Sequence, residues 1–323
     1  KIKNRIKLIH ESTDNPILCQ NKILQHNVRF SKNTLFGKNH NFNKIEHYSH
    51  FIKMIPLYDY NTIKRYIDIS MDYKSDILWP GKIKWFAKSS GTTNNQSKFI
   101  PITNESLRLC HFKAGKDMLS LYFQNNPNSK ILKGKSLMIG GSTNVNKSKY
   151  SYVGDLSAII IKNLPIWVQI KRLPSIKTAL LENWEKKIQQ IITESLNQNI
   201  TSISGVPSWM AIIINQLMTK MDIKCLTEIW PNIELYMHGG VSFENYKESF
   251  NNYINKKPIH YLELYNASEG FFGIQDDINK SDLLLLINHG IFYEFIPIEE
   301  GQEKEAKIIP LENVKINQIY SMV

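Results

Sequence analysis

The feature that most constrains the fold is a regular alternation of short apolar runs and amphipathic segments through the middle of the chain. Strand-like runs are predicted at residues 83–87, 99–100, 136–139, 201–204, 233–237 and 259–264. Helical spacing of apolar residues predicts helices at residues 104–124, 176–196, 207–218 and 243–254, with Asn104 as a cap and Pro207 in a first turn. Alternation of this kind favours mostly parallel sheets covered by helices. We therefore predict an α/β fold.

The two ends of the chain depart from this alternation. Up to about Tyr73 the sequence is mainly helical, with apolar residues such as Ile52, Ile55, Ile63 and Ile67 at helical spacing. From Leu283 onward, strand-like runs with short connections follow at residues 283–287, 292–296, 307–309 and 319–323. We predict an α/β region over residues 1–282, with a helical N-terminal segment, and a β-rich, barrel-like subdomain over residues 283–323.

Composition and charge exclude several classes of protein. The 323 residues include 40 Lys+Arg and 29 Asp+Glu, a formal charge of +11. The basic residues are dispersed rather than clustered, so we expect no nucleic-acid partner, although such a surface attracts any polyanion. Three scattered cysteines are too few for a disulfide scaffold and favour a reducing, cytoplasmic setting. No segment approaches the roughly 18 apolar residues of a membrane helix, so no membrane association is expected.

The strongest functional signal is the small-residue segment Ser89-Ser90-Gly91-Thr92-Thr93, which follows a predicted strand and precedes Lys98. Small residues allow consecutive backbone N–H groups to surround a phosphate, and Lys98 can add a positive charge. The spacing differs from that of a Walker loop. An ordinary Ser/Thr turn between two strands is the alternative.

Two further segments follow predicted strands. Tyr265–Gly270 (YNASEG) contains an aromatic ring that can stack on a purine and, in Glu269, a carboxylate that can hold Mg²⁺. His238-Gly239-Gly240 allows close contact with a flat ligand. Ligands of open α/β sheets bind beyond the carboxyl ends of the strands, where both segments are expected. Taken alone, each segment is better explained as an ordinary turn, with a buried Tyr265 in the first and a satisfied His238 in the second.

Together and in this order, the three segments resemble the nucleotide loops of the adenylate-forming superfamily. More closely, the chain resembles the auxin-responsive (Gretchen Hagen) acyl-acid–amido synthetase family, especially its bacterial members. The segments that carry this resemblance are Thr34–Gly37 with His40 and Phe42, Ile55–Tyr60, Leu78–Gly81, Gly205–Met210, Tyr265–Gly273 and Phe292–Pro297.

The resemblance implies the N-terminal fold of adenylate-forming enzymes and a ligase activity. Such enzymes adenylate a carboxylic acid with Mg·ATP and then transfer the acyl group to an amino acid or amine. Carried over by position, the ATP-binding residues would be Ser89, Ser90, Gly91, Thr92, Thr93, Lys98, Gly239, Gly240, Tyr265, Ser268 and Glu269. Lys98, Thr92 and Glu269 would be catalytic, and Glu269 would ligate Mg²⁺.

The chain departs from the family in two places. Asn94-Asn95 stand where relatives commonly have a glycine, and Asn tolerates the left-handed conformation better than most residues. The family's ribose-binding Tyr-Arg-x-Gly-Asp-like motif and its small C-terminal lid domain are absent before Val323. On the resemblance, we expect a C-terminally truncated and catalytically incomplete enzyme.

The acyl-acid pocket is harder to predict. Val206, Trp209 and Phe271 lie beside predicted site segments, but each is also a candidate for ordinary core packing. His111 is either near the site or a satisfied helix residue. Two other functions stay open: an acyl-CoA-type ligase with a thiol acceptor, and an inactive family member that only binds nucleotide.

Overall fold

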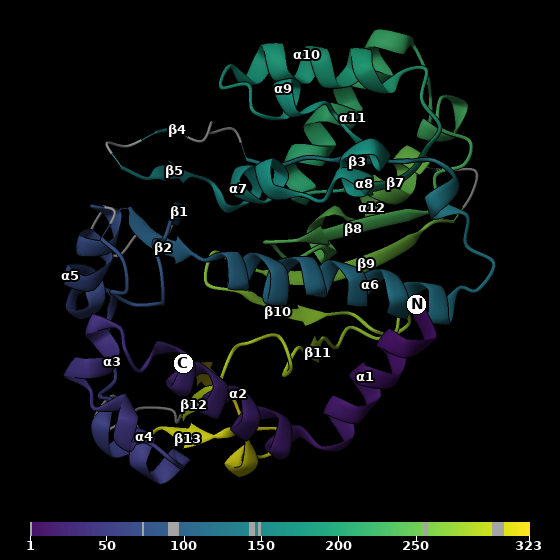
Figure 1. The fold of residues 1–323 in the computed structure, drawn as a ribbon. Coiled ribbons are helices and arrows are strands. Elements are labelled where there is room, and N and C mark those ends of the chain that lie inside the picture. The colour runs from purple at the N-terminus through teal and green to yellow at the C-terminus, as the bar shows by residue number, and fades with distance from the viewer. Residues whose placement is uncertain are drawn as a thin grey trace. The chain divides into compact units, whose positions relative to one another are not determined.

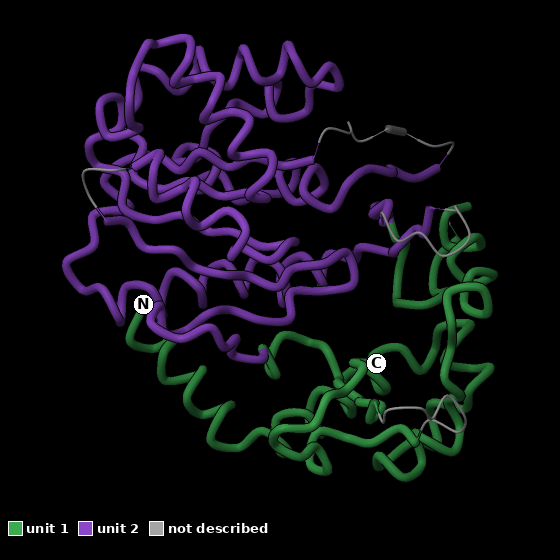
Figure 2. Tube along the Cα trace, turned by 180° about the vertical axis from the view of Figure 1, so that it is seen from behind, with its two compact units in different colours: residues 1–83, 286–323 green, residues 84–285 purple. Residues whose placement is uncertain are grey.

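The chain forms two compact units. The computed structural model describes residues 2–72, 74–89, 97–141, 146–147, 150–254, 258–298 and 307–323. One unit comprises Lys1–Ile83 with Leu286–Val323, and the other comprises Lys84–Leu285 (Figure 2). The predicted domain boundary after residue 282 stays a prediction.

The Lys84–Leu285 unit is built on a mixed, mostly parallel sheet (Figure 1). In the part of the chain that the structure describes, its strand order is β11-β10-β9-β8-β7-β3-β6. The strands are β3 (Lys135–Met138), β6 (Arg172–Leu173), β7 (Ile200–Ser204), β8 (Leu235–Gly239), β9 (His260–Asn266), β10 (Phe271–Ile274) and β11 (Leu284–Leu285). Strands β6, β3, β7, β8 and β9 run parallel, and only β10 and β11 are antiparallel to their neighbours. The predicted α/β class is confirmed.

One face of this sheet carries the main apolar core. The helices that contribute to it are α10 (Trp184–Ser195), α11 (Pro207–Met221) and α12 (Glu244–Ile254). Ile188, Ile191 and Ile192 of α10 are fully buried there, because their spacing places them on one helix face. Burying each such side chain contributes about 1.5–3 kcal/mol.

The other face of the sheet is covered by the long segment after the predicted phosphate loop. Alternate residues of β8 face opposite sides. Tyr236 belongs to the main core, whereas Leu235 and Met237 are buried away from it. A π-helix, η3 (Ser106–His111), leads into α6 (Phe112–Asn125), which lies in front of β9 and β10 in Figure 1. The Tyr122 hydroxyl of α6 donates to Glu234 Oε1 (2.8 Å) at the start of β8.

A smaller sheet in the same unit has the order β2-β1-β5-β4. Its strands are β1 (Trp85–Ser89), β2 (Lys98–Ile102), β4 (Asn146–Lys147) and β5 (Tyr152–Gly154), and nearby helices are α7 (Leu156–Asn163), α8 (Ile166–Lys171) and α9 (Ile176–Ala179). Ala87, Ile102 and Leu107 form a second core with Ile159 of α7. This core joins the β1–β2 hairpin to η3.

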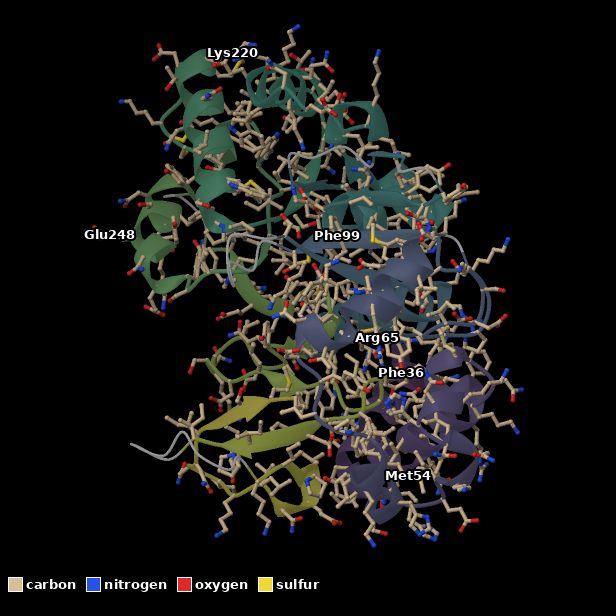
Figure 3. All side chains as sticks on the ribbon, turned by 90° about the vertical axis from the view of Figure 1, so that its left-hand side faces the viewer. Phe36, Met54, Arg65, Phe99, Lys220 and Glu248 are labelled. Atoms are coloured by element: carbon tan, nitrogen blue, oxygen red, sulfur yellow. The ribbon has the colours of Figure 1, made fainter. Side chains whose placement is uncertain are left out.

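The Lys1–Ile83 and Leu286–Val323 unit is helical at its start and β-rich at its end. Its helices are α1 (Ile2–Asp14), α2 (Pro16–Ser31), α3 (Leu35–Asn39), α4 (Tyr48–Met54) and α5 (Tyr60–Met71), and its antiparallel sheet contains β12 (Glu294–Pro297), β13 (Ile309–Pro310) and β14 (Tyr320–Met322). Phe36 of α3 packs against His40 (ring centroids 4.1 Å apart) and against Tyr66 of α5. Figure 3 labels Phe36, together with Arg65 of α5.

Several predicted elements differ from the structure. The helix predicted over residues 176–196 is broken between α9 and α10, because Asn183 Oδ1 accepts the backbone N–H of Lys186 and starts a new helix. Thr103 rather than Asn104 caps the helical segment before α6, since Thr103 Oγ1 accepts the Ser106 N–H (2.9 Å). Strand β9 continues to Asn266, two residues beyond the prediction. The first strand of the predicted tail is β11, which pairs with β10 in the large sheet.

The structure also bears on membrane and disulfide predictions. Among the described residues, no helix combines the length and the apolar character that crossing a bilayer requires. Cys19, Cys110 and Cys225, all within the described part of the chain, form no disulfide with one another.

Candidate functional site

Glycine-containing turns follow the parallel strands of the large sheet at their carboxyl ends. Gly140-Gly141 follows β3, Gly205 follows β7, and β8 ends at Gly239-Gly240. The pairs Ser204↔Met237 and Gly239↔Leu264 are in register, so the ends of β7, β8 and β9 lie side by side. This edge is where an open α/β sheet binds its ligands.

The two glycines of the β8 turn are required for different reasons. A Cβ on Gly239 would lie 2.2 Å from the Leu264 carbonyl oxygen, so only glycine allows β8 and β9 to approach this closely. Gly240 has φ +83°, a conformation that L-residues adopt only with strain. A Cβ there would meet only the Val206 Cγ2 atom, at 3.5 Å. Gly239 is half-buried and Gly240 is exposed, so a ligand can approach the backbone of this turn at Gly240.

Ser268 and Glu269 occupy the tip of a tight hairpin. Ala267 and Gly270 exchange backbone hydrogen bonds of 2.8 and 3.2 Å, which leaves these two residues as the connection between β9 and β10. The Glu269 side chain is exposed, and Ser268 is half-buried. The hairpin thus presents a carboxylate beyond the edge of the sheet.

Tyr265 lies within β9 rather than after it. Its side chain is 50% exposed, and its ring contacts Phe272 of β10 at 5.2 Å between centroids. Half of the side chain is therefore free to meet a flat ligand, whereas the sequence also allowed a fully buried tyrosine.

The predicted phosphate loop begins and ends in the β1–β2 hairpin. Ser89 closes β1, Lys98 opens β2, and the two are paired in register. Of the predicted phosphate ligands, Ser90, Gly91, Thr92 and Thr93 lie outside the described residues, as do Asn94-Asn95. The described part therefore fixes the two ends of this segment.

Contacts from η3 join the hairpin region to the β9–β10 segment. His111 Nδ1 lies 3.1 Å from Asn266 Oδ1, and the Phe271 backbone N–H donates to Cys110 Sγ (3.2 Å). Leu107 of the same π-helix packs in one apolar core with Ala87 of β1 and Ile102 of β2. The helix η3 therefore contacts both the β1–β2 hairpin and the β9–β10 segment.

Two buried histidines near this edge are held neutral. Burial lowers the pKa of His111 to about 4, against a smaller opposing effect of its hydrogen bond to Asn266. Burial also lowers the pKa of His238 to about 4. His238 stacks on Phe243 with ring centroids 4.1 Å apart. Neither histidine is suited to hold a positive charge at neutral pH.

The predicted acyl-pocket residues fall in different surroundings. Val206 is half-buried beside Gly240. Trp209 of α11 packs on the main core and against Trp184, with ring centroids 6.0 Å apart. Phe271 is buried, and its backbone is held by Cys110. Their roles in substrate binding stay predictions.

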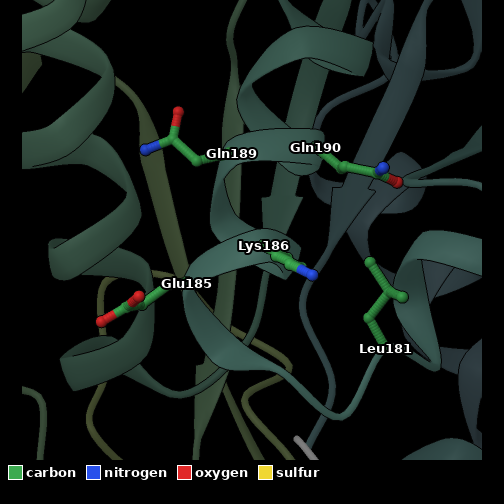
Figure 4. A pocket seen from close by; sticks show the side chains of 5 residues that line it. All are labelled: Leu181, Glu185, Lys186, Gln189 and Gln190. Atoms are coloured by element: carbon green, nitrogen blue, oxygen red, sulfur yellow. The ribbon is translucent and has the colours of Figure 1, made fainter.

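A surface hollow of about 430 Å³ lies elsewhere, on the outer side of α10 (Figure 4). It is lined by Leu181, Glu185, Lys186, Gln189 and Gln190. The four polar residues are exposed, and none of the predicted site residues takes part. We therefore assign no chemistry to this hollow.

The carboxylate of Glu269 is suited to a metal ion that is held partly by the protein and partly by a bound ligand. Among the described residues, no group of three or more His, Cys, Asp or Glu side chains is placed to hold a metal ion. Mg²⁺ is commonly held by one or two carboxylates together with substrate phosphates. The exposed carboxylate of Glu269 fits that mode of binding and does not form a protein-only metal centre.

Sequence reasoning missed a buried lysine and a second glycine pair at this edge. Lys187 of α10 is almost fully buried, and its Nζ donates to the Gly141 carbonyl oxygen (2.6 Å). Its place on the apolar face of α10, between Trp184 and Ile191, could have signalled this burial. The turn Met138-Ile139-Gly140-Gly141 also repeats the pattern of Met237-His238-Gly239-Gly240.

Comparison with protein-family models decides the family. The GH3 family N-terminal domain matches residues 5–259, and the GH3 family central domain matches residues 284–323. The chain belongs to the GH3 family. The family expected from the sequence motifs is thereby confirmed.

Solved structures agree with this assignment at the level of the fold. "AtGH3.15 acyl acid amido synthetase in complex with 2,4-DB" aligns with a TM-score of 0.77 and 17% identity, covering 100% of this GH3 chain and 65% of that chain. "GH3.15 acyl acid amido synthetase" aligns with a TM-score of 0.78 and 16% identity, covering 98% of this chain and 64% of that chain. The GH3 chain thus spans about two thirds of the length of these relatives. A search of curated proteins finds no match.

Proposed function

We propose that this GH3 chain carries the ATP- and acyl-acid-binding part of an acyl-acid–amido synthetase. In the proposed reaction, a carboxylate oxygen of the acid attacks the α-phosphorus of ATP, and the bond to pyrophosphate breaks. An amine nitrogen of an amino acid or amine then attacks the acyl carbon, and AMP leaves. The observation that carries the proposal is the edge formed by Gly239-Gly240, the half-exposed Tyr265 and the Glu269 hairpin.

Each proposed contact has a physical reason. Tyr265 would stack on the adenine, with Gly239 and Gly240 beside it, because a half-exposed ring and an exposed glycine backbone can both approach a planar base. Lys98, with Ser89 and the segment that includes Ser90–Thr93, would bind the phosphates, and Lys98 would offset the charge that develops on pyrophosphate. Ser268 and Glu269 would bind ATP from the tip of the β9–β10 hairpin.

Glu269 would hold Mg²⁺, which would supply further neutralisation of that charge. Val206, Trp209 and Phe271 are the candidates to contact the acid. No covalent enzyme nucleophile is required.

Binding and exchange measurements test the proposal. The chain should bind Mg·ATP and catalyse ATP–pyrophosphate exchange with a carboxylic acid, for which 2,4-DB, the ligand named for a structural relative, is a first probe. Lys98→Ala and Glu269→Gln should each raise the Kd for Mg·ATP by about tenfold or more. The Kd is obtained from the thermal stabilisation of the fold by ATP. Lys88→Ala, on the same hairpin, and Glu248→Gln on α12 are exposed matched controls.

Different outcomes separate the alternatives. Mg·ATP binding without exchange would favour a chain that only binds nucleotide, and exchange followed by thioester formation would favour an acyl-CoA-type ligase. No effect of ATP on thermal stability, together with no effect of either substitution, would contradict the proposal.

A further inference from the structure

Lys187 is a buried charged residue for which core packing gives no reason. It lies on α10, its side chain is 1% exposed, and its neighbours Ile188 and Ile191 belong to the main apolar core. A buried lysine loses hydration and is rare unless a specific partner compensates it. The partners of its ammonium group therefore indicate its role.

The first partner is the turn after β3. Lys187 Nζ donates to the Gly141 carbonyl oxygen at 2.6 Å. From the other side, the Gly141 backbone N–H donates to Ser157 Oγ (2.8 Å), and a Cβ on Gly141 would lie 2.1 Å from Asp155 Oδ2. The turn is thus held between α10 and the start of α7.

The second partner is an aromatic pair. Lys187 Nζ lies 5.8 Å from the centroid of the Trp184 ring, one turn earlier on α10. Trp184 in turn contacts Trp209 of α11. A cation near the face of an aromatic ring is attracted to it, most strongly where water is excluded. Lys187 therefore contacts, through Trp184, a residue proposed for the acid pocket.

The turn after β3 continues into the neighbouring strand ends. A Cβ on Gly205 would lie 3.1 Å from the Ile139 Cβ, and the Ile139 N–H donates to the Ser204 carbonyl oxygen (2.8 Å). Val206, the next residue, is the side chain beside Gly240. A shift at residues 139–141 would therefore be transmitted to Gly205 and Val206.

We propose that Lys187 is a positioning residue for the acyl-acid side of the site: it holds the turn after β3 and the Trp184–Trp209 pair, and so fixes the position of Val206 and Trp209. This inference rests on the proposed function and adds a residue that does not itself touch the acid. Burial lowers the pKa of Lys187 to about 8, and Asp155 is the charged side chain that opposes this shift. Both the charged and the neutral amine can donate to the Gly141 carbonyl oxygen.

Lys187→Met tests the proposal, because Met keeps the length of the side chain but removes the donor and the charge. Lys186→Met, on the exposed side of the same helix, is the matched control. In amide hydrogen exchange, Lys187→Met should accelerate exchange in peptides covering residues 139–141 and 205–209, with residues 265–274 unchanged. Unchanged exchange in residues 139–141 and 205–209 of a folded Lys187→Met protein would overturn the proposal.

Ligand affinities give a second readout. Lys187→Met should weaken 2,4-DB binding by about tenfold, the equivalent of one lost hydrogen bond, and change ATP affinity by less than about twofold. Lys187→Arg, which keeps a donor and the charge, should recover part of the loss. Equal losses for both ligands would indicate general damage and overturn the positioning role.

The two proposals fail in different ways. A wild-type chain that binds neither ATP nor 2,4-DB contradicts the proposed function, while hydrogen exchange still decides the role of Lys187. If Lys187→Met does not fold, Trp184→Leu tests the same link, and it should accelerate exchange around Trp209 without affecting residues 265–274. Unchanged exchange around Trp209 in that variant would again overturn the proposal.

Discussion

His111 Nδ1 lies 3.1 Å from Asn266 Oδ1, although 155 positions separate the two residues in the sequence. An amide oxygen only accepts hydrogen bonds, so Nδ1 carries the proton and donates it. His111 ends the π-helix that packs beneath the β1–β2 hairpin, and Asn266 is the last residue of β9. This hydrogen bond joins the segment after the predicted phosphate loop to the segment that contains Tyr265 and Glu269.

Asn266→Leu should therefore destabilise the fold. The substitution leaves the buried His111 N–H without its acceptor, which costs about 1–3 kcal/mol in the free energy of unfolding. Urea denaturation measures this, with the exposed Asn252→Leu on α12 as a control. Adding His111→Phe should recover part of the loss, because the orphaned donor is removed. If Asn266→Leu unfolds at the same urea concentration as the wild type, the hydrogen bond does not stabilise the hairpin.

The free energy of unfolding should fall as the pH falls from about 6.5 to 4. His111 and His238 have pKa values lowered to about 4 by burial, so the unfolded chain binds more protons than the folded chain in this window. At pH 4.5 each histidine should lower the free energy of unfolding by roughly 2–3 kcal/mol relative to neutral pH. Chemical denaturation at pH 7 and pH 4.5 measures the difference.

Substitutions assign this acid sensitivity to the two histidines. His111→Gln and His238→Phe should each reduce the pH dependence, because neither replacement gains a proton in this range. His10→Gln, at an exposed position of α1, should leave the dependence unchanged. An acid dependence that persists undiminished in both variants would assign it to other groups.

Periodicity was sufficient to predict the elements that bury one face over several residues. The strands that became β3, β7 and β8, and the helices α11 and α12, appear within a few residues of their predicted bounds. Strands β5, β6 and β10 were missed, because two to four residues give no readable period. The break between α9 and α10 was missed since the apolar spacing continues across it, and only the Asn183 cap marks it.

The candidate site could be predicted by position along the chain but not by contact. Gly239 and Gly240 could be placed at a strand end from the preceding apolar run, whereas Tyr265 lies inside β9 and not after it as predicted. The Lys187–Gly141 hydrogen bond could not be predicted, because it requires knowledge of which carbonyl group faces α10. For the same reason no sequence pattern could assign His111 to Asn266. Such contacts depend on the packing of elements that are distant in sequence.

The contacts of Gln20, in the other unit, could not be predicted from the sequence either, and they lead to a further testable prediction. The buried Gln20 side chain donates through Nε2 to the carbonyl oxygens of Ile287 (2.7 Å) and Ile291 (3.1 Å), and its Oε1 accepts the Tyr293 N–H (2.8 Å). Gln20→Leu should cost about 3 kcal/mol, because buried backbone groups lose their partner.

Thermal or urea unfolding measures this effect. Asn27→Leu on the same helix loses one exposed hydrogen bond, to the Gly290 carbonyl oxygen, and should cost less than about 1 kcal/mol. Equal effects of the two substitutions would show that Gln20 is no more important than a surface contact.

Alanine substitutions at three glycines should have effects of different size and sign. Gly239→Ala should be the most damaging, by about 3 kcal/mol or more, since its Cβ would collide with the Leu264 carbonyl oxygen and force β8 away from β9. Gly240→Ala should cost about 1–2 kcal/mol, because φ +83° strains an L-residue although space is available. Gly115→Ala in α6 meets no atom within 4 Å and should stabilise the helix by up to about 1 kcal/mol.

If ATP binds at the carboxyl ends of β8 and β9, Gly239→Ala should also weaken ATP binding, while Gly115→Ala leaves it unchanged. Equal stability of all three variants would contradict the close approach of β8 and β9 on which the proposed adenine site depends.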